Sequence, residues 1–322
     1  MNQNRGAGGR GPYHRPELLR EIDWSEKNLQ NLKRDVEMFV PLQGQNQFKR
    51  MNILLLGQVG AGKSSIVNTI TSIFGDYASH KAESTSSDHS VTRVYRQYQI
   101  RSSTGTDLAF RLCDTKGIED GETIRTEEIQ RMIGGEKLDM ETSEPSYDGS
   151  SRSKFQYWKD KLFGFARWMR RWIFKAKALD INMRAYCVVY VIDASTLHVI
   201  PENVANYFKD CRKLMKQNEG IPEIVLLTKA DDCSTEVEGD LKAISYCPDI
   251  KTVVQKVMDK FGFHANQIFP VVNILKDVRV RTETSILFLM ALRQMLFEGR
   301  DHIRELVDKK KINIDAPGDH IV

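Results

Sequence analysis

The stretch Gly57-Gln58-Val59-Gly60-Ala61-Gly62-Lys63-Ser64 decides the fold of this chain, because it satisfies the phosphate-binding pattern G-x-x-x-x-G-K-[ST]. An apolar run at 52–56 precedes it and a helical pattern at 63–74 follows it, which is the context that the pattern requires. Backbone N–H groups of such a loop converge on phosphate oxygens, and the positive end of the helix adds to the attraction. A glycine-rich turn without a ligand is the weaker alternative.

Two further motifs follow in order, each at the end of an apolar run. Asp114-Thr115-Lys116-Gly117 comes after 108–113, and Thr228-Lys229-Ala230-Asp231 comes after 223–227. We expect Asp114 to hold Mg²⁺ through water and the Gly117 amide to meet the γ-phosphate. The Asp231 carboxylate can accept hydrogen bonds from N1 and the 2-amino group of guanine, which adenine cannot donate, and the Lys229 stem can cover the base. The ordered motifs predict a guanine-nucleotide site for GTP or GDP.

The remaining site residues are placed by position. Lys63 is expected to reach the outer phosphates, and Ser64 to ligate Mg²⁺. Thr92 is the expected Mg²⁺-binding threonine of the first switch, with Thr85 as the alternative, and Asn273 should lie near the base, where backbone atoms usually make the contact. The predicted nucleotide-binding residues are Gly57, Val59, Gly60, Ala61, Gly62, Lys63, Ser64, Ser65, Gly117, Thr228, Lys229, Asp231 and Asn273, and the predicted Mg²⁺ ligands are Ser64, Thr92 and Asp114.

The pattern of elements predicts one α/β domain. Polar residues 102–107 separate 94–100 from 108–113, which indicates a hairpin, and the nearly continuous apolar runs at 185–192 and 223–227 are typical of buried parallel strands. Helices are expected at 253–261 and 284–298 around a strand at 267–272, and another is expected from Ser25 to before Pro41. The predicted organisation is a disordered tail at 1–12, a helical extension at 13–45, the main domain at 46–310 and a tail at 311–322.

Composition sets outer limits on function. The chain has 47 Lys and Arg against 43 Asp and Glu, and a net charge of +4 gives no reason to expect nucleic-acid binding. Its five cysteines are widely spaced, which favours reduced thiols over a zinc site or disulfides. We find no secretory signal, no run of roughly 20 apolar residues and no lipidation motif, so a cytoplasmic location is predicted.

Several phrases of the sequence together resemble a known family. They are Val-Gly-Ala-Gly-Lys-Ser-Ser, Leu-Cys-Asp-Thr-Lys-Gly-Ile-Glu, Val-Val-Tyr-Val-Ile-Asp-Ala and Leu-Leu-Thr-Lys-Ala-Asp. In combination, over about residues 12–310, they resemble the interferon-induced protein 44-like GTPase family. The resemblance implies a Ras-like P-loop G domain, with a mostly parallel sheet, one antiparallel edge strand and helices on both faces. It also implies GTP binding and a cytoplasmic role associated with the immune response.

Two residues argue against fast hydrolysis. Ras-type enzymes have glutamine directly after the D-x-x-G glycine, where this chain has Ile118, which cannot orient water. The P-loop has Val59, where many fast GTPases keep glycine. The expectation is a slow, conformationally switching GTPase whose catalytic residue is unknown, and the alternative is a nucleotide-holding scaffold with negligible hydrolysis.

A basic, aromatic helical insert is predicted at about 145–182. Between 154 and 179 its apolar residues recur every three or four positions, and three of the chain's four tryptophans lie there. Three interpretations stay open: an interfacial helix on an anionic membrane, a helix that binds a protein partner or dimerises, and a helix that lies across its own domain. A homodimer through the G domain is a further possibility for a partner.

Overall fold

The computed structural model describes residues 21–44, 48–75, 95–118, 126–135, 181–273 and 280–309. Its strands are β1 (Met51–Gly57), β2 (Tyr95–Arg101), β3 (Asp107–Thr115), β4 (Ala185–Asp193), β5 (Glu223–Thr228) and β6 (Ile268–Pro270). Its longer helices are α1 (Glu26–Glu37), α2 (Lys63–Gly75), α3 (Thr126–Gly134), α5 (Glu202–Gln217), α7 (Pro248–Phe261) and α8 (Thr282–Asp308). The predicted tails, the threonines Thr85 and Thr92, and the insert up to 180 lie outside the described residues.

The strands form one six-stranded sheet in the order β2-β3-β1-β4-β5-β6. β2 pairs antiparallel with β3, and the other neighbours pair in parallel. The single antiparallel strand is therefore at the edge, which confirms the predicted mostly parallel sheet and the hairpin. All residues of β1, β4 and β5 are buried, because helices cover both faces of a parallel sheet and leave no face for polar side chains.

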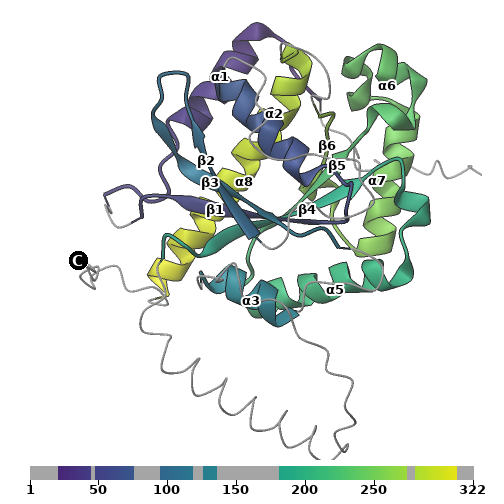
Figure 1. Cartoon of the computed structure of the whole chain (residues 1–322). Coiled ribbons are helices and arrows are strands. Elements are labelled where there is room, and N and C mark those ends of the chain that lie inside the picture. The colour runs from purple at the N-terminus through teal and green to yellow at the C-terminus, as the bar shows by residue number, and fades with distance from the viewer. Residues whose placement is uncertain are drawn as a thin grey trace, which may run out of the picture.

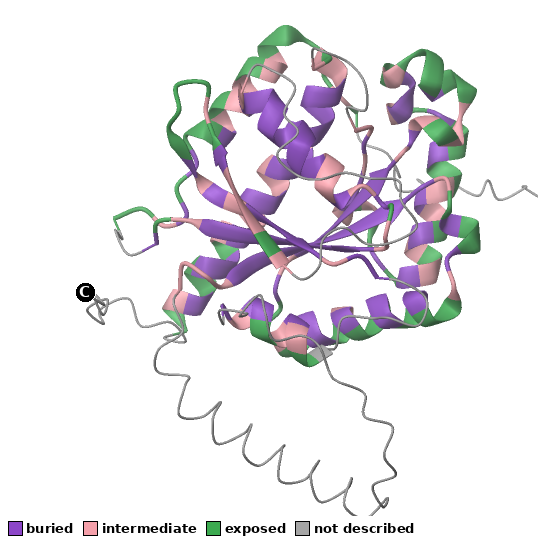
Figure 2. Cartoon of the chain, in the orientation of Figure 1, coloured by how far each residue is buried: buried purple, intermediate pink, exposed green. Residues whose placement is uncertain are grey.

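The helices make a layer on each face of the sheet (Figure 1). Helices α2 and α8 lie on one face, and α1 packs outside them against α8. Helices α3 and α5 lie on the other face, with α7 beside α5. The buried residues in Figure 2 accordingly gather along the strands and on the inward sides of the helices. This three-layer arrangement leaves the carboxyl ends of the parallel strands as the natural place for a ligand.

Helix α1 begins where the sequence signals place it. Ser25 is its N-cap, and the Ser25 hydroxyl accepts a hydrogen bond of 3.2 Å from the backbone N–H of Asn28. Leu32 and Val36 are buried, one helical turn apart, so that one face of α1 packs on α8. The guanidinium of Arg293 on α8 reaches Asp35 at 3.2 Å. The extension thus packs on the main body of the protein.

Two elements differ from the sequence expectation. Helix α8 has 27 residues and runs ten residues beyond the predicted end at 298, because His302, Ile303 and Leu306 keep its inward face buried. The charged residues around them hide that periodicity in the sequence. Strand β6 has only three residues and is shorter than predicted. Helix α5, which the sequence analysis did not identify, covers the sheet with residues such as Phe208.

Candidate nucleotide-binding site

The three motifs meet at one edge of the sheet. The P-loop follows β1, the D-x-x-G motif begins in the last two residues of β3, and the Thr228–Asp231 motif begins at the end of β5. Because β1, β3 and β5 run in parallel, their carboxyl ends share an edge. Ligands of open α/β sheets bind at this edge, so the fold brings together what the sequence separates by more than a hundred residues.

The P-loop glycines are required by its geometry. Gly60 and Gly62 have φ of +75° and +94°, in the left-handed region that favours glycine. A Cβ on Gly57 would lie 2.4 Å from the carbonyl oxygen of Val191 on β4, so no side chain fits there. Ser65 follows Ser64 in the first turn of α2, which begins at Lys63. The P-loop therefore exposes backbone groups, and no bulky side chains, at the N-terminus of α2.

Lys63 is folded over its own loop. Its ammonium donates hydrogen bonds to the carbonyl oxygens of Gly57 and Gln58, both at 2.9 Å, and its side chain is 6% exposed. Burial disfavours the ammonium and lowers the pKa of Lys63 to about 8, while the charge of Asp114 opposes that shift. A buried cation with only carbonyl partners and one carboxylate in reach is stabilised further by phosphate anions.

Ser64 and Asp114 form the donor set for a metal. The Ser64 hydroxyl donates to Asp114 Oδ2 at 2.8 Å, and Asp114 is fully buried at the end of β3. Protein sites for Mg²⁺ commonly use one or two protein ligands and leave the other positions to phosphates and water. One hydroxyl and one carboxylate beside a phosphate-binding loop fit that chemistry. The third predicted ligand, Thr92, lies outside the described residues.

The D-x-x-G loop is hydrogen-bonded directly to the P-loop. The N–H of Ile118 donates to the Gly57 carbonyl at 3.0 Å, and the N–H of Val59 donates to the Ile118 carbonyl at 3.2 Å. Gly117 passes under Val59, since a Cβ on Gly117 would lie 2.3 Å from Val59 Cγ2. The Ile118 side chain is 1% exposed. The position that holds glutamine in Ras-type enzymes is therefore part of the core here.

The base end of the site is built around the end of β5. Lys229 has a φ of +55°, which is uncommon for a residue with a side chain and occurs where the surrounding structure holds the backbone in place. Its ammonium pairs with Asp193 Oδ2 at 2.5 Å. Asp231 begins the 3-10 turn Asp231–Cys233, and burial raises its pKa. The ion pair thus holds the Lys229 ammonium at the carboxyl end of β4, where Asp193 is the last residue.

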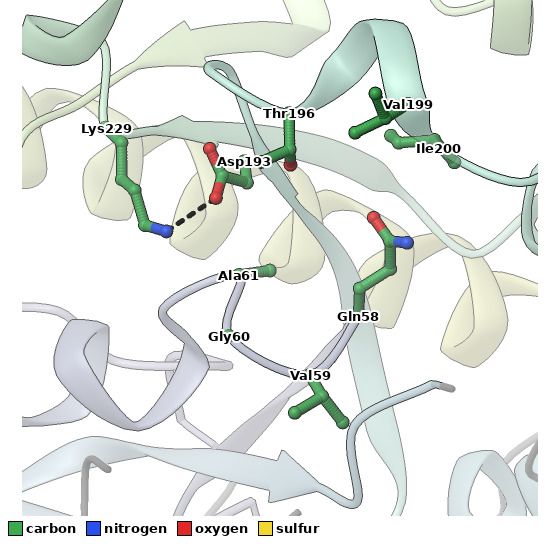
Figure 3. A pocket seen from close by; sticks show the side chains of 9 residues that line it. All are labelled: Gln58, Val59, Gly60, Ala61, Asp193, Thr196, Val199, Ile200 and Lys229. Atoms are coloured by element: carbon green, nitrogen blue, oxygen red, sulfur yellow. Dashed lines mark hydrogen bonds and ion pairs between the residues drawn. The ribbon is translucent and has the colours of Figure 1, made fainter. Parts of the chain in front are cut away.

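A pocket of about 290 Å³ separates the P-loop from the loop after β4. Figure 3 shows Lys229 and Asp193 pointing toward one another across one side, and Gln58 extending toward Ile200 on the other. The pocket is lined by Gln58, Val59, Gly60, Ala61, Asp193, Thr196, Val199, Ile200 and Lys229. It leaves one flank of the phosphate loop open, next to Gly60, where a Cβ would meet nothing within 4 Å.

The predicted site residues that the structure describes lie at the carboxyl edge of the sheet. Thr92 is outside the described residues. Asn273 lies beside Gly62, whereas Gly117 lies against Val59 of the P-loop. Sequence reasoning missed Asp193 as the partner of Lys229. A carboxylate at the carboxyl end of an otherwise apolar strand is a signal that could have identified it. The burial of Ile118 had no such local signal.

Comparison with known proteins agrees with this geometry. Residues 52–144 match the family model described as 50S ribosome-binding GTPase. The chain is 29% identical to interferon-induced protein 44 of Pan troglodytes over 259 residues, which are 80% of this chain and 54% of that protein. It is 30% identical to interferon-induced protein 44-like of Homo sapiens, over 80% of this chain and 53% of that protein.

The chain is a relative of the interferon-induced 44 proteins. This confirms the resemblance noted in the sequence, and the chain spans about half the length of the curated relatives it matches. Among solved structures, a probable GTP-binding protein engB is 15% identical and covers 79% of this chain and 99% of its own, with a TM-score of 0.36. The chain carries a GTPase domain, which implies guanine-nucleotide binding.

Within the described residues the structure has no helix that could span a lipid bilayer. The same residues contain no group of three or more His, Cys, Asp or Glu side chains placed to hold a metal ion. A Mg²⁺ ion at Ser64 and Asp114 would depend on nucleotide oxygens and water, as is usual for this ion.

Proposed function

We propose that this protein binds GTP and GDP with Mg²⁺ and changes conformation according to the nucleotide. The observation that carries the proposal is the placement of Asp231, a carboxylate suited to guanine, at the same sheet edge as the buried ammonium of Lys63. Phosphates would be bound by the P-loop amides and Lys63, and the base would lie between the Lys229 stem and Asp231. Mg²⁺, held by Ser64 and Asp114, would neutralise phosphate charge.

The contact between Gly117 and the P-loop supports a switching role. The Gly117 N–H can serve a γ-phosphate only where the loop 114–118 comes close to the P-loop, and two backbone hydrogen bonds already hold it there. Nucleotides with and without a γ-phosphate would therefore bind this loop with different contacts. A difference in affinity between the two states is the thermodynamic requirement for a switch.

Slow hydrolysis follows from the same contacts. Hydrolysis needs an attacking water held in line with the γ-phosphate, and the buried Ile118 side chain can neither reach nor bind one. The burial of Ile118 also favours the second candidate function, a nucleotide-holding scaffold with negligible turnover. Multiple-turnover phosphate release, measured beside nucleotide affinity, separates the two.

Nucleotide selectivity tests the proposal. Purified protein should bind GDP and GTP at micromolar concentration or below in the presence of Mg²⁺, and ADP and ATP far more weakly. Lys63→Ala should abolish phosphate-dependent binding, while Lys213→Ala, which removes an exposed lysine of α5, should leave it intact. Equal affinity for adenine and guanine nucleotides, or undiminished binding by Lys63→Ala, would refute the proposal.

The cellular proposal rests on the relatives' names and, for location, on the sequence expectation. By analogy with proteins named as interferon-induced, we propose that expression of this protein rises after interferon treatment and that it serves the immune response. From the sequence expectation, we propose that it is cytoplasmic. Immunoblotting of treated and untreated cells, with fractionation of the lysate, tests the three statements. Constant expression, or recovery in membranes alone, would contradict them.

A further inference from the structure

A second pocket, of about 450 Å³, lies at the amino end of β5. Its walls are the loop 220–222, which joins α5 to β5, and one face of α8. Strand β5 separates this pocket from Thr228 by about 17 Å, because a strand rises about 3.3 Å per residue. The pocket therefore lies at the edge of the sheet opposite the nucleotide site and forms no part of that site.

The walls of this pocket are acidic, although the chain as a whole has a net charge of +4. Against the ammonium of Lys216, the carboxylates that line the pocket are those of Glu223, Glu298, Asp301 and Glu305. Glu223 is paired with the Arg212 guanidinium at 3.3 Å. The other three carboxylates lie on one face of α8, at intervals of three and four residues. This face of α8 therefore attracts cations.

The carboxylates of Asp301 and Glu305 have partners that another cation can replace. Asp301 pairs with Arg304 at 3.2 Å. Glu305 pairs with Lys309. The four side chains are between 47% and 66% exposed, and exposed ion pairs between neighbours on a helix contribute little to stability. A cation from another part of the chain can therefore take their place at little cost.

A buried imidazole beside these carboxylates has an unfilled hydrogen-bonding position. His302 lines the pocket and is 4% exposed, and within the described part of the chain its Nε2 has no hydrogen-bond partner. Burial lowers the pKa of His302 to about 4, and the charge of Arg184 acts in the same direction, so the imidazole is neutral at pH 7. With its proton on Nδ1, a neutral imidazole accepts a hydrogen bond at Nε2. The neighbouring carboxylates favour a donor that carries positive charge.

The chain on both sides of residues 136–180 is fixed beside this pocket. Gly135, directly after α3, packs on the backbone of the segment before β4, since a Cβ on Gly135 would lie 2.7 Å from the Arg184 nitrogen. The Arg184 guanidinium pairs at 2.8 Å with Glu219. Glu219 directly precedes Gly220, which lines the pocket. The two ends of the stretch 136–180 therefore meet at the rim of the acidic pocket.

The later part of that stretch is strongly basic. Between 167 and 177 the chain has no acidic residue, and its cations are those of Arg167, Arg170, Arg171, Lys175 and Lys177. Only four residues separate Lys177 from Ile181, a span of at most about 14 Å in an extended chain. A short tether raises the local concentration of a segment to about millimolar, so weak charge contacts suffice for binding.

We propose that the basic segment 167–177 of this chain docks in the acidic pocket between α8 and the loop 220–222. One arginine or lysine of the segment donates to His302 Nε2, and its neighbours pair with the carboxylates of Asp301 and Glu305. Ile221 and Pro222 line the pocket and give an apolar wall for the stem of the inserted side chain. The inference goes beyond the proposed function and is independent of it, because it gives the insert a specific site on its own domain.

Protection of the segment from trypsin tests the docking. Trypsin cleaves after lysine and arginine, and cleavage of a docked segment requires that it first open. We would follow cleavage at 167–177 by mass spectrometry, in the full chain and in a pocket variant that combines Glu298→Gln, Asp301→Asn and Glu305→Gln. Loss of three exposed ion pairs should speed this cleavage roughly three- to a hundredfold. The matched control combines Glu236→Gln, Glu238→Gln and Asp249→Asn, exposed acids of α6 (Thr235–Gly239) and α7, and should leave the rate unchanged.

Two further measurements separate the contacts. At about 1 M salt, where charges are screened beyond about 3 Å, the unaltered protein should be cleaved at the rate of the pocket variant. His302→Gln keeps an acceptor and should retain the protection, whereas His302→Leu should lose part of it. Equal cleavage of these two variants would overturn the assigned role of His302.

The inference as a whole has two outcomes that would overturn it. One is equal cleavage of the unaltered protein and the pocket variant. The other is protection that grows with protein concentration, which would place the segment on a second copy of the chain. GDP affinity, measured on the same preparations, should be equal in the unaltered protein and the pocket variant. Failure of the docking therefore leaves the proposed function intact, and absence of GDP binding overturns the proposed function alone.

Discussion

Raising the pH from 7 to 8.5 should weaken nucleotide binding through Lys63. Burial lowers the pKa of this ammonium to about 8, against the opposing charge of Asp114. Bound phosphates stabilise the charged form and raise the pKa of Lys63 in the complex. Binding therefore takes up a proton wherever the free protein has lost it. The affinity for nucleotide is therefore highest below pH 8 and falls as the pH rises through that value.

The size of the effect follows from the charged fraction of Lys63 in the free protein. With a pKa of about 8, Lys63 is charged in roughly nine-tenths of the free protein molecules at pH 7 and in roughly a quarter of them at pH 8.5. If the complex keeps Lys63 charged throughout, the dissociation constant for GDP should rise about fourfold over this interval. An unshifted lysine, with a pKa of about 10.4, would give almost no change.

The assay is a titration with a fluorescent GDP analogue at constant ionic strength and fixed free Mg²⁺, in steps from pH 7 to 8.5. Lys63→Arg is the matched control, since arginine stays charged throughout and its affinity, whatever its value, should be independent of pH. A constant dissociation constant for the unaltered protein would refute the reasoning about burial. An equal decline in Lys63→Arg would show that another group titrates.

Three substitutions follow from packing. Gly117→Ala places its Cβ 2.7 Å from the Cα of Val59, so urea denaturation should show a loss of about 1–3 kcal/mol in unfolding free energy; unchanged stability contradicts the contact. Ile118→Gln buries an amide and should cost about 1–3 kcal/mol without raising GTP turnover in single-turnover assays; faster turnover contradicts its burial. Arg212→Met leaves Glu223, 3.3 Å away, buried without its ion-pair partner and removes the hydrogen bond from Arg212 to the Phe261 carbonyl, so denaturation should show a loss of about 3–5 kcal/mol; a neutral effect contradicts the pairing.

The strands and the three motifs could be predicted from the sequence because their signals are local. A strand buried on both faces is an apolar run, and β1, β4 and β5 were found within one residue of their observed ends at either side. The P-loop pattern encodes its own backbone geometry, since Gly60 and Gly62 adopt positive φ. Polar residues at the carboxyl ends of the strands mark the site, as the position of Asp114 near the end of β3 shows.

The contacts that tune the site could not be predicted, because they join residues far apart in the chain. Ile118 is buried because the loop that carries it hydrogen-bonds to Gly57, and nothing in its neighbours on the chain indicates that. The Thr69–Asn273 contact joins a helix to a loop 204 residues away. The pKa of Lys63 depends on how closely its own loop encloses it, which no pattern of residue types records.

The selectivity of Asp231→Asn between guanosine and xanthosine diphosphates tests the central claim most directly. Guanine has a 2-amino donor where xanthine has an oxygen, so replacing the Asp231 carboxylate with an amide should favour the xanthine base. The account predicts that the unaltered protein prefers GDP and that the variant prefers XDP, with both proteins melting at similar temperatures. Unchanged preference for GDP in the folded variant would contradict the assignment of this edge of the sheet as a guanine-nucleotide site.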